Sequence, residues 1–195
     1  MSAMHPQGGR ALDAFEKVVR AAPVPGRELG LSFIRAPEPN AFSYGQGKVA
    51  ITLGMLDLAR GEEDLAAVLA HEVAHDLLGH VERKLTLAAG ISIGFTVLNV
   101  FVPGAGWADL AVNPLATTAY SRTQELDADA LGVWLYERAG FRREGFVSLL
   151  ELIREKRGAR EGGFLSTHPA IDDRIRRIRA GDVRVPPPFG NGAPG

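Results

Sequence analysis

Cysteine is absent from the 195 residues of this chain, and charges of the two signs nearly cancel at a formal net value of −1. The absence of cysteine excludes a thiol nucleophile, a disulfide framework and a thiolate metal site, although it does not fix the cellular compartment. The balanced charge gives no general attraction to nucleic acid or anionic lipid, and we predict no nucleic-acid partner. Hydrophobic residues make up 46% of the chain, which is enough for the core of a single domain.

The two ends of the chain lack the features of folded or targeting segments. The first ten residues contain no apolar run of the kind that forms a signal peptide. We expect residues 1–10 to be a disordered head, trimmed or foreign to the native start, so a native export signal need not be part of this sequence. Residues 11–182 are expected to form one domain. Residues 183–195 are rich in proline and glycine and are expected to be an extended or disordered tail.

The segment that organises the chain is His71-Glu72-Val73-Ala74-His75, which lies in a run of strong helix formers. Residues four apart share a face of a helix, so His71 and His75 present two imidazoles to one point, as a tetrahedral Zn²⁺ ion requires. Glu72 lies one step round the helix, where it can take a proton from water at the metal without binding the metal itself. The alternative is a buried helix with two satisfied histidines. A third ligand downstream would decide between them.

The third ligand is predicted on a second helix over residues 121–139. Glu125 and Asp129 are four residues apart and share a face, and the small residues Ala128 and Gly132 let another helix approach that face closely. We therefore predict Glu125 as the third ligand and Asp129 as a residue that orients a ligand or anchors the helix. The alternative is a solvated acidic stripe.

Hydrophobic periodicity predicts the remaining elements. The motif helix is expected to run from about Glu62 to Lys84, and His80 should lie off its ligand face, with a structural or solvent-facing role. Other helices are expected over 11–21, 54–60 and 144–156 and from Pro169 onwards, and strands over 29–34, 40–44 and 48–53.

Residues 85–108 contain no charged residue, although the chain must return from this segment to bring Glu125 to the metal. A single membrane crossing would separate Glu125 from His71 and His75 across the bilayer. We therefore favour a hairpin with apolar surface left for a membrane, a partner or a second copy of the chain. An ordinary buried hairpin remains the alternative.

Several of these motifs together resemble the M48 family of zinc metalloendopeptidases, and the likeness extends over roughly residues 29–180. It is carried by the segment 71–75, by Glu125 with Asp129, by Val49 to Leu56, by Pro39-Asn40-Ala41-Phe42, and by Ser166-Thr167-His168-Pro169 followed by Arg174. The resemblance implies an α+β, mainly helical gluzincin-type domain with a small antiparallel sheet beside the motif helix. It further implies peptide-bond hydrolysis, work on misfolded proteins, and a place in the bacterial cell envelope, periplasmic or membrane-associated, with the cytoplasm left open.

The function predicted is that of an endopeptidase with one Zn²⁺ per chain, held by His71, His75 and Glu125. Glu72 acts as the general base on the attacking water and then passes the proton to the leaving amine. Extended protein or peptide substrates are expected to add as a strand to an open sheet edge, which the resemblance places at Asn40, Ala41 and Phe42. The alternative function is a zinc-containing chaperone or scaffold without turnover.

His168 is predicted to reach the active site, because the residue before a proline is held extended and its ring has a fixed direction. Two roles stay open beside that of a simple N-cap-like histidine. His168 and Arg174 could stabilise the developing oxyanion. Alternatively, His168 could bind the metal as a fourth ligand in the resting enzyme and displace the water.

Overall fold

A computed structural model of the protein describes residues 5–91, 119–156 and 163–189. Helices dominate the described residues and a small sheet accompanies them, which confirms a mainly helical α+β fold. Within these ranges no helix combines the length and apolar character needed to cross a bilayer. The elements are α1 (Gly8–Ala21), β1 (Gly30–Ile34), β2 (Ala41–Gly45), β3 (Lys48–Thr52), α2 (Leu53–Leu58), α3 (Glu62–Leu77), α4 (His80–Ile91), α7 (Arg122–Arg138), α8 (Arg143–Glu155), α9 (Phe164–Thr167) and α10 (Ile171–Ala180).

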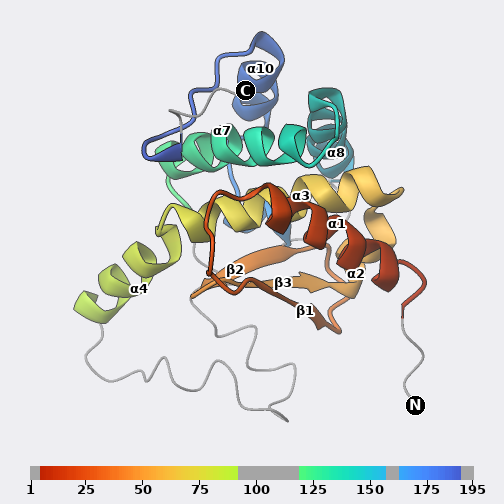
Figure 1. Cartoon of the computed structure of the whole chain (residues 1–195), viewed down its shortest axis with the longest axis horizontal. Helices are drawn as coiled ribbons and strands as arrows, with labels where there is room; N and C mark the ends of the chain where they lie inside the picture. The colour runs from red at the N-terminus through yellow and green to blue at the C-terminus, as the bar shows by residue number, and fades with distance from the viewer. Residues whose placement is uncertain (1–4, 92–118, 157–162, 190–195) are drawn as a thin grey trace.

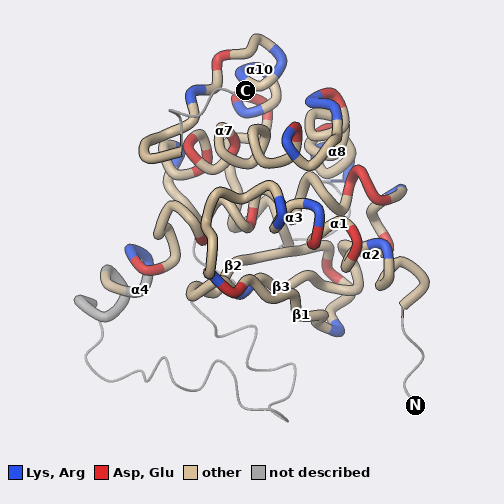
Figure 2. Tube along the Cα trace, in the orientation of Figure 1, with Lys and Arg blue, Asp and Glu red and all other residues tan. Residues whose placement is uncertain are grey.

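Helix α3 lies in the middle of the molecule and is buried on every side along most of its length (Figure 1). Helices α7 and α8 pack on one side of it, α1 packs on another, and strand β2 approaches it from the sheet. Its first turn carries Glu62, Glu63 and Asp64, seen as the red stretch at the start of α3 in Figure 2, where the helix dipole favours acidic side chains. The element that carries the predicted motif is therefore the centre of the core.

The sheet is mixed rather than antiparallel as predicted. Strand β3 lies between the other two strands, pairing antiparallel with β2 and parallel with β1. Strands β2 and β3 form a tight hairpin because Gln46 and Gly47 adopt positive φ angles of 55° and 80°, which suits a type I′ turn. Strands β1 and β2 are thus the two edge strands, and the chain that connects them passes through Pro37 and Pro39.

The motif helix is shorter than predicted. It ends at Leu77 instead of continuing to Lys84, because Gly79 adopts a left-handed φ of 65° and terminates the helix. The Leu78 N–H donates to the Ala74 carbonyl and the Gly79 N–H donates to the Asp76 carbonyl, which satisfies the last turn. The chain re-enters a helix at His80, so α4 starts in a new direction.

The boundaries at the two ends also differ from the expected ones. The disordered head predicted for residues 1–10 is wrong in its last residues, since α1 begins at Gly8. In the tail, Val183, Val185 and Phe189 pack against the core, so this part is not free of the domain. Helix α10 begins at Ile171, two residues later than expected.

Most of the uncharged segment 85–108 lies outside the described residues, apart from the last turns of α4.

Candidate active site

The two histidines of α3 meet as their spacing predicts. His71 and His75 are 1% and 0% exposed, and their Nε2 atoms lie 3.1 Å apart. Glu72 is fully buried beside them and accepts a hydrogen bond from the Ser43 N–H of β2 at 3.0 Å. A hydrogen bond from β2 thus fixes one carboxylate oxygen of Glu72.

Helix α7 brings Glu125 to the same point. The helix starts in a capping box in which Ser121 and Gln124 bond each other's backbone N–H groups, so Glu125 sits in the first turn. Its Oε1 lies 3.3 Å from His75 Nε2 and its Oε2 lies 3.6 Å from His71 Nε2. The close approach depends on Gly132, where an added Cβ would lie 3.2 Å from the His71 Cα. The small residues noted in the sequence therefore do bring α7 against α3.

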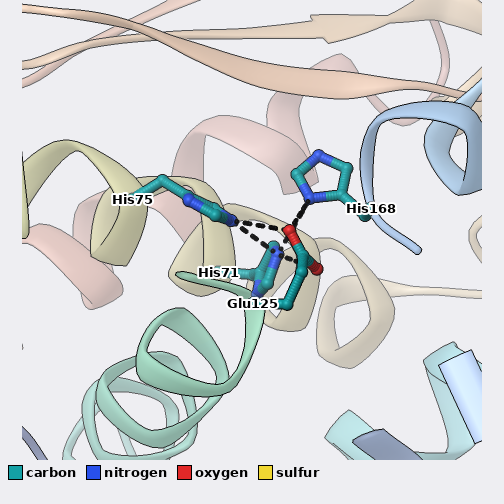
Figure 3. Close-up of side chains that lie close together, drawn as sticks. All are labelled: His71, His75, Glu125 and His168. Atoms are coloured by element: carbon teal, nitrogen blue, oxygen red, sulfur yellow. Dashed lines mark hydrogen bonds and ion pairs between the residues drawn. The ribbon is translucent and has the colours of Figure 1, made fainter. Parts of the chain in front are cut away.

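His168 enters the cluster from the loop after α9. Its Nδ1 lies 3.2 Å from His71 Nε2 and 3.0 Å from Glu125 Oε1, and its ring stacks on Phe164 at a centroid distance of 4.1 Å. The simple N-cap role is wrong, because Ala170 occupies the N-cap position of α10 and His168 is fully buried. Figure 3 shows the four side chains converging, with His71 and His75 from one helix and Glu125 and His168 from elsewhere.

The donor set fits a tetrahedral metal ion. Among the described residues, His71, His75, Glu125 and His168 form a buried group whose ligand atoms all lie within 4.8 Å of one another. Bonds of about 2.0–2.1 Å in a tetrahedral zinc site separate the ligand atoms by roughly 3.3 Å, and the separations given above lie near that value. The Oε1 atom of Glu72 and the Nε2 atom of His168 are 3.3 Å apart, and neither has a hydrogen-bond partner in the described part of the chain. These donors suit zinc better than a cation that prefers oxygen ligands.

Asp129 and Arg174 hold the cluster from the side of α7 and α10. Arg174 is fully buried and donates from Nε and Nη2 to the two oxygens of Asp129, each at 2.8 Å. Its Nη1 lies 2.7 Å from Glu125 Oε2, while Asp129 Oδ1 lies 3.1 Å from His71 Nδ1. Asp129 and Arg174 therefore contact the ligands of the cluster, and each guanidinium nitrogen of Arg174 already faces a carboxylate.

The two buried glutamates differ in electrostatic environment. Burial raises the pKa of Glu72, which suits a group that must hold a proton during a reaction. Burial also acts to raise the pKa of Glu125, but the charge of Arg174 and the hydrogen bonds with His168 and His71 outweigh it and keep that pKa well below the usual range. The pKa values of Glu72 and Glu125 are therefore shifted in opposite directions, upward for Glu72 and downward for Glu125.

The predicted substrate strand lies at the edge of the sheet beside this cluster. Asn40, Ala41 and Phe42 are 8%, 0% and 2% exposed. Asn40 faces β3, since its carbonyl accepts from Thr52 N–H, whereas Ser43 faces away and donates to Glu72. Because successive residues of a strand direct their backbone groups to opposite sides, the outward groups of β2 are those of Ala41 and Ser43.

Two residues next to the cluster were not identified from the sequence. His80, predicted to be structural or solvent-facing, is buried, which fits the structural alternative, but its contact with the cluster was not expected: its Nδ1 lies 2.9 Å from His75 Nδ1. Tyr120 stacks on the His75 ring at 3.8 Å between centroids. The sequence signal for the position of His80 was Gly79, because a glycine at the C-terminal end commonly terminates a helix. The direction of His80 relative to His75 therefore could not be calculated as if one helix continued through both residues.

The comparisons with known proteins agree with this geometry. A model of peptidase family M48 matches residues 9–182. The chain belongs to peptidase family M48. Mitochondrial metalloendopeptidase OMA1 of Schizosaccharomyces pombe is 30% identical over 177 residues, which cover 89% of this chain and 52% of that protein. Beta-barrel assembly-enhancing protease of Escherichia coli is 28% identical over 166 residues, which cover 77% of this chain and 34% of that protein. Metalloprotease LoiP of the same organism is 24% identical over 163 residues, which cover 79% of this chain and 63% of that protein. The chain therefore spans about half the length of the first relative and about a third of the second.

Proposed function

We propose that this member of the M48 family is a zinc-dependent endopeptidase that cleaves extended or misfolded protein chains. The observation that carries the proposal is the convergence of His71, His75 and Glu125 on one buried point with the carboxylate of Glu72 beside it. The peptidase family and the names of the relatives support hydrolysis of peptide bonds.

One zinc ion would be held by His71, His75 and Glu125, where it supplies a Lewis acid that polarises a carbonyl and acidifies water. Glu72 takes the proton from the attacking water at Oε1, because Oε2 is engaged by the Ser43 N–H. The raised pKa of the buried Glu72 lets it keep that proton until the amine leaves. Asp129 positions His71, and Arg174 positions both Asp129 and Glu125.

An extended substrate would pair with the outward edge of β2, as predicted for Asn40, Ala41 and Phe42. Backbone pairing of this kind gives loose sequence preference, and it requires that Ala41, which is 0% exposed here, become accessible. A proline scan of residues 41–44 tests this role. Proline there should lower activity and leave bound zinc unchanged, whereas loss of zinc would indicate a folding role instead.

His168 is proposed as a fourth ligand of the resting enzyme. The support is the position of its Nδ1, which faces His71 Nε2 and Glu125 Oε1 rather than the bulk solvent. Arg174 is proposed as an anchor for the carboxylates rather than an oxyanion donor, because its nitrogens are already engaged.

The His168→Ala variant separates the two roles of His168. If His168 blocks the metal, removing it raises peptidase activity. A fall in kcat of roughly a hundredfold would show an oxyanion donor instead. Wild-type kcat and KM would contradict both roles.

The cell envelope is proposed as the place of action, supported by the relative named for β-barrel assembly. The competing function is a zinc-containing chaperone or scaffold that uses the same site without turnover. The retention of Glu72 favours the enzyme, since a scaffold has no need of a general base.

Casein cleavage by the zinc-loaded wild type and Glu72→Gln proteins tests the enzyme. The glutamine keeps the shape and removes the base, so activity should fall by at least a hundredfold while zinc stays bound. Equal cleavage by the two proteins would refute the proposed mechanism.

A further inference from the structure

We propose that His80 is a positioning residue of the metal site, which accepts a hydrogen bond from the Nδ1–H of His75 and fixes the direction of its Nε2. The inference rests on the metal-binding part of the proposed function and not on turnover. Neither the i, i+4 motif nor the family resemblance assigns a role to His80.

The contact joins two buried imidazoles. The Nδ1 atoms of His75 and His80 are 2.9 Å apart, the two residues are 0% and 1% exposed, and the rings meet at 65° with centroids 5.0 Å apart. At this separation one proton must lie between the two nitrogens, because two lone pairs or two N–H groups facing each other would repel. The pair is therefore a donor and an acceptor.

The other side of His75 decides which ring donates. Its Nε2 faces the cluster, 3.1 Å from His71 Nε2 and 3.3 Å from Glu125 Oε1. A nitrogen that binds a metal must keep its lone pair, so the proton of a neutral His75 belongs on Nδ1. His80 Nδ1 is therefore the acceptor of this hydrogen bond. His80 is not itself a metal ligand, since the group that could hold a metal among the described residues does not include it.

The break in the helix makes this contact possible. On a continuous helix, a residue five positions after His75 would point roughly 140° away from it. Gly79 ends α3 with a left-handed φ of 65°, and α4 then begins at His80 with its ring turned back over His75. Gly79 therefore contributes to this contact, because the helix break at Gly79 directs His80 Nδ1 toward His75 Nδ1.

His71 offers an independent parallel. Its Nδ1 lies 3.1 Å from Asp129 Oδ1, so each histidine of the motif has a partner for the nitrogen that faces away from the cluster. Such partners fix both the tautomer and the ring orientation of metal-binding histidines. His80 performs for His75 the task that Asp129 performs for His71.

The test compares His80→Leu with His80→Asn in the full chain. The leucine removes the acceptor and keeps an apolar filling, whereas the asparagine places Oδ1 near the former Nδ1. Zinc affinity is measured by competition with a chromogenic chelator. We expect His80→Leu to weaken zinc binding by roughly 10- to 100-fold and His80→Asn to remain within about threefold of the wild type. His5→Leu, which removes a histidine outside the cluster, serves as the control and should match the wild type.

Three results would overturn the proposal: a wild-type zinc affinity in His80→Leu, an equal loss in the two variants, or no zinc binding by the wild type. Long-range ¹H–¹⁵N NMR of the zinc-free wild type reports which nitrogen of His75 carries the proton, and therefore decides the matter even if His80→Leu fails to fold. A proton on Nε2 would contradict the proposal. Tight zinc binding without casein cleavage would refute the peptidase and leave the role of His80 intact.

Discussion

The two histidines of the motif lie one turn apart on α3, yet their surroundings differ in chemistry. On the side of His71 the partners are charged, because Asp129 faces its Nδ1 and Arg174 bridges Asp129 and Glu125. On the side of His75 the partners are aromatic rings. Tyr120 stacks on His75 with the ring centroids 3.8 Å apart, and His80 Nδ1 lies 2.9 Å from His75 Nδ1.

The pKa values of the two histidines follow this difference. Burial and the charge of Arg174 act to lower the pKa of His71, but hydrogen bonds to Asp129 and Glu125 outweigh them and raise it to about 9. Burial dominates at His75 and keeps its pKa well below the usual value. The charged side should therefore depend on complete pairing, since a buried charge without its partner is costly. On the aromatic side, the contact with Tyr120 should depend on ring packing rather than on the Tyr120 hydroxyl.

The largest expected effect is that of Arg174→Met. The change removes the buried guanidinium that pairs with both Asp129 and Glu125 and leaves His71 as their remaining cationic neighbour, so the free energy of unfolding of the zinc-free protein should fall by roughly 3–5 kcal/mol. Zinc bound as proposed would supply a counter-charge to Glu125, and the loss should then be smaller in the loaded protein. Urea unfolding with and without zinc measures both. The control is Arg176→Met on the same helix, where the side chain is 69% exposed and the expected change is within about 0.5 kcal/mol. Similar losses in the two variants would contradict the comparison.

A smaller effect is expected from Gly132→Ala. The new Cβ would lie 3.2 Å from the Cα and 3.3 Å from the backbone N of His71, and the rigid backbone of α3 cannot yield easily. We expect α7 to move away, lowering the free energy of unfolding by roughly 1–3 kcal/mol and weakening zinc binding because Glu125 moves with it. Chemical denaturation and chelator competition measure the two effects. In α1, an added Cβ at Gly9 meets nothing within 4 Å, so Gly9→Ala should leave both quantities unchanged or raise stability slightly.

On the aromatic side, Tyr120 can be changed in two ways. Tyr120→Leu removes the ring that stacks on His75, and should lower the free energy of unfolding by about 1–1.5 kcal/mol and weaken zinc binding severalfold. Tyr120→Phe keeps the ring and removes a hydroxyl that has no hydrogen-bond partner among the described residues, so it should match the wild type. Thermal and urea unfolding distinguish the two. A loss in Tyr120→Phe as large as that in Tyr120→Leu would show that the hydroxyl, and not the ring, matters.

The smallest effect concerns Lys84, which is 9% exposed and whose Nζ lies 3.5 Å from the centroid of the Tyr120 ring. Burial lowers the pKa of Lys84 to about 8, whereas an unfolded chain holds the proton up to about pH 10.4. The charged lysine therefore costs stability below pH 8, and this cost fades as the pH rises toward 10. The cation–π contact offsets part of the cost.

Lys84→Met should therefore raise the free energy of unfolding at pH 7 by roughly 0.5–1 kcal/mol, and less at pH 10. Urea unfolding at the two pH values measures it, with the exposed Lys48→Met as control. A gain that grows with pH would reverse the sign and refute the argument.

The sequence by itself determined the part of the site that local geometry fixes. Residues four apart share a face of any helix, so His71 with His75 and Glu125 with Asp129 could be paired without a structure, and the small Gly132 indicated the close contact of α7 with α3. The strands and most helices followed from periodicity for the same reason.

Only the tertiary structure decided the rest. The break at Gly79 turned His80 onto His75, the central position of β3 made the sheet mixed, and the loop after α9 placed His168 Nδ1 among the ligand atoms. Arg174 likewise reached Asp129 and Glu125 from a helix far along the chain. Periodicity describes one element at a time, whereas these contacts depend on how separate elements pack, and packing is set by the whole core rather than by any single stretch.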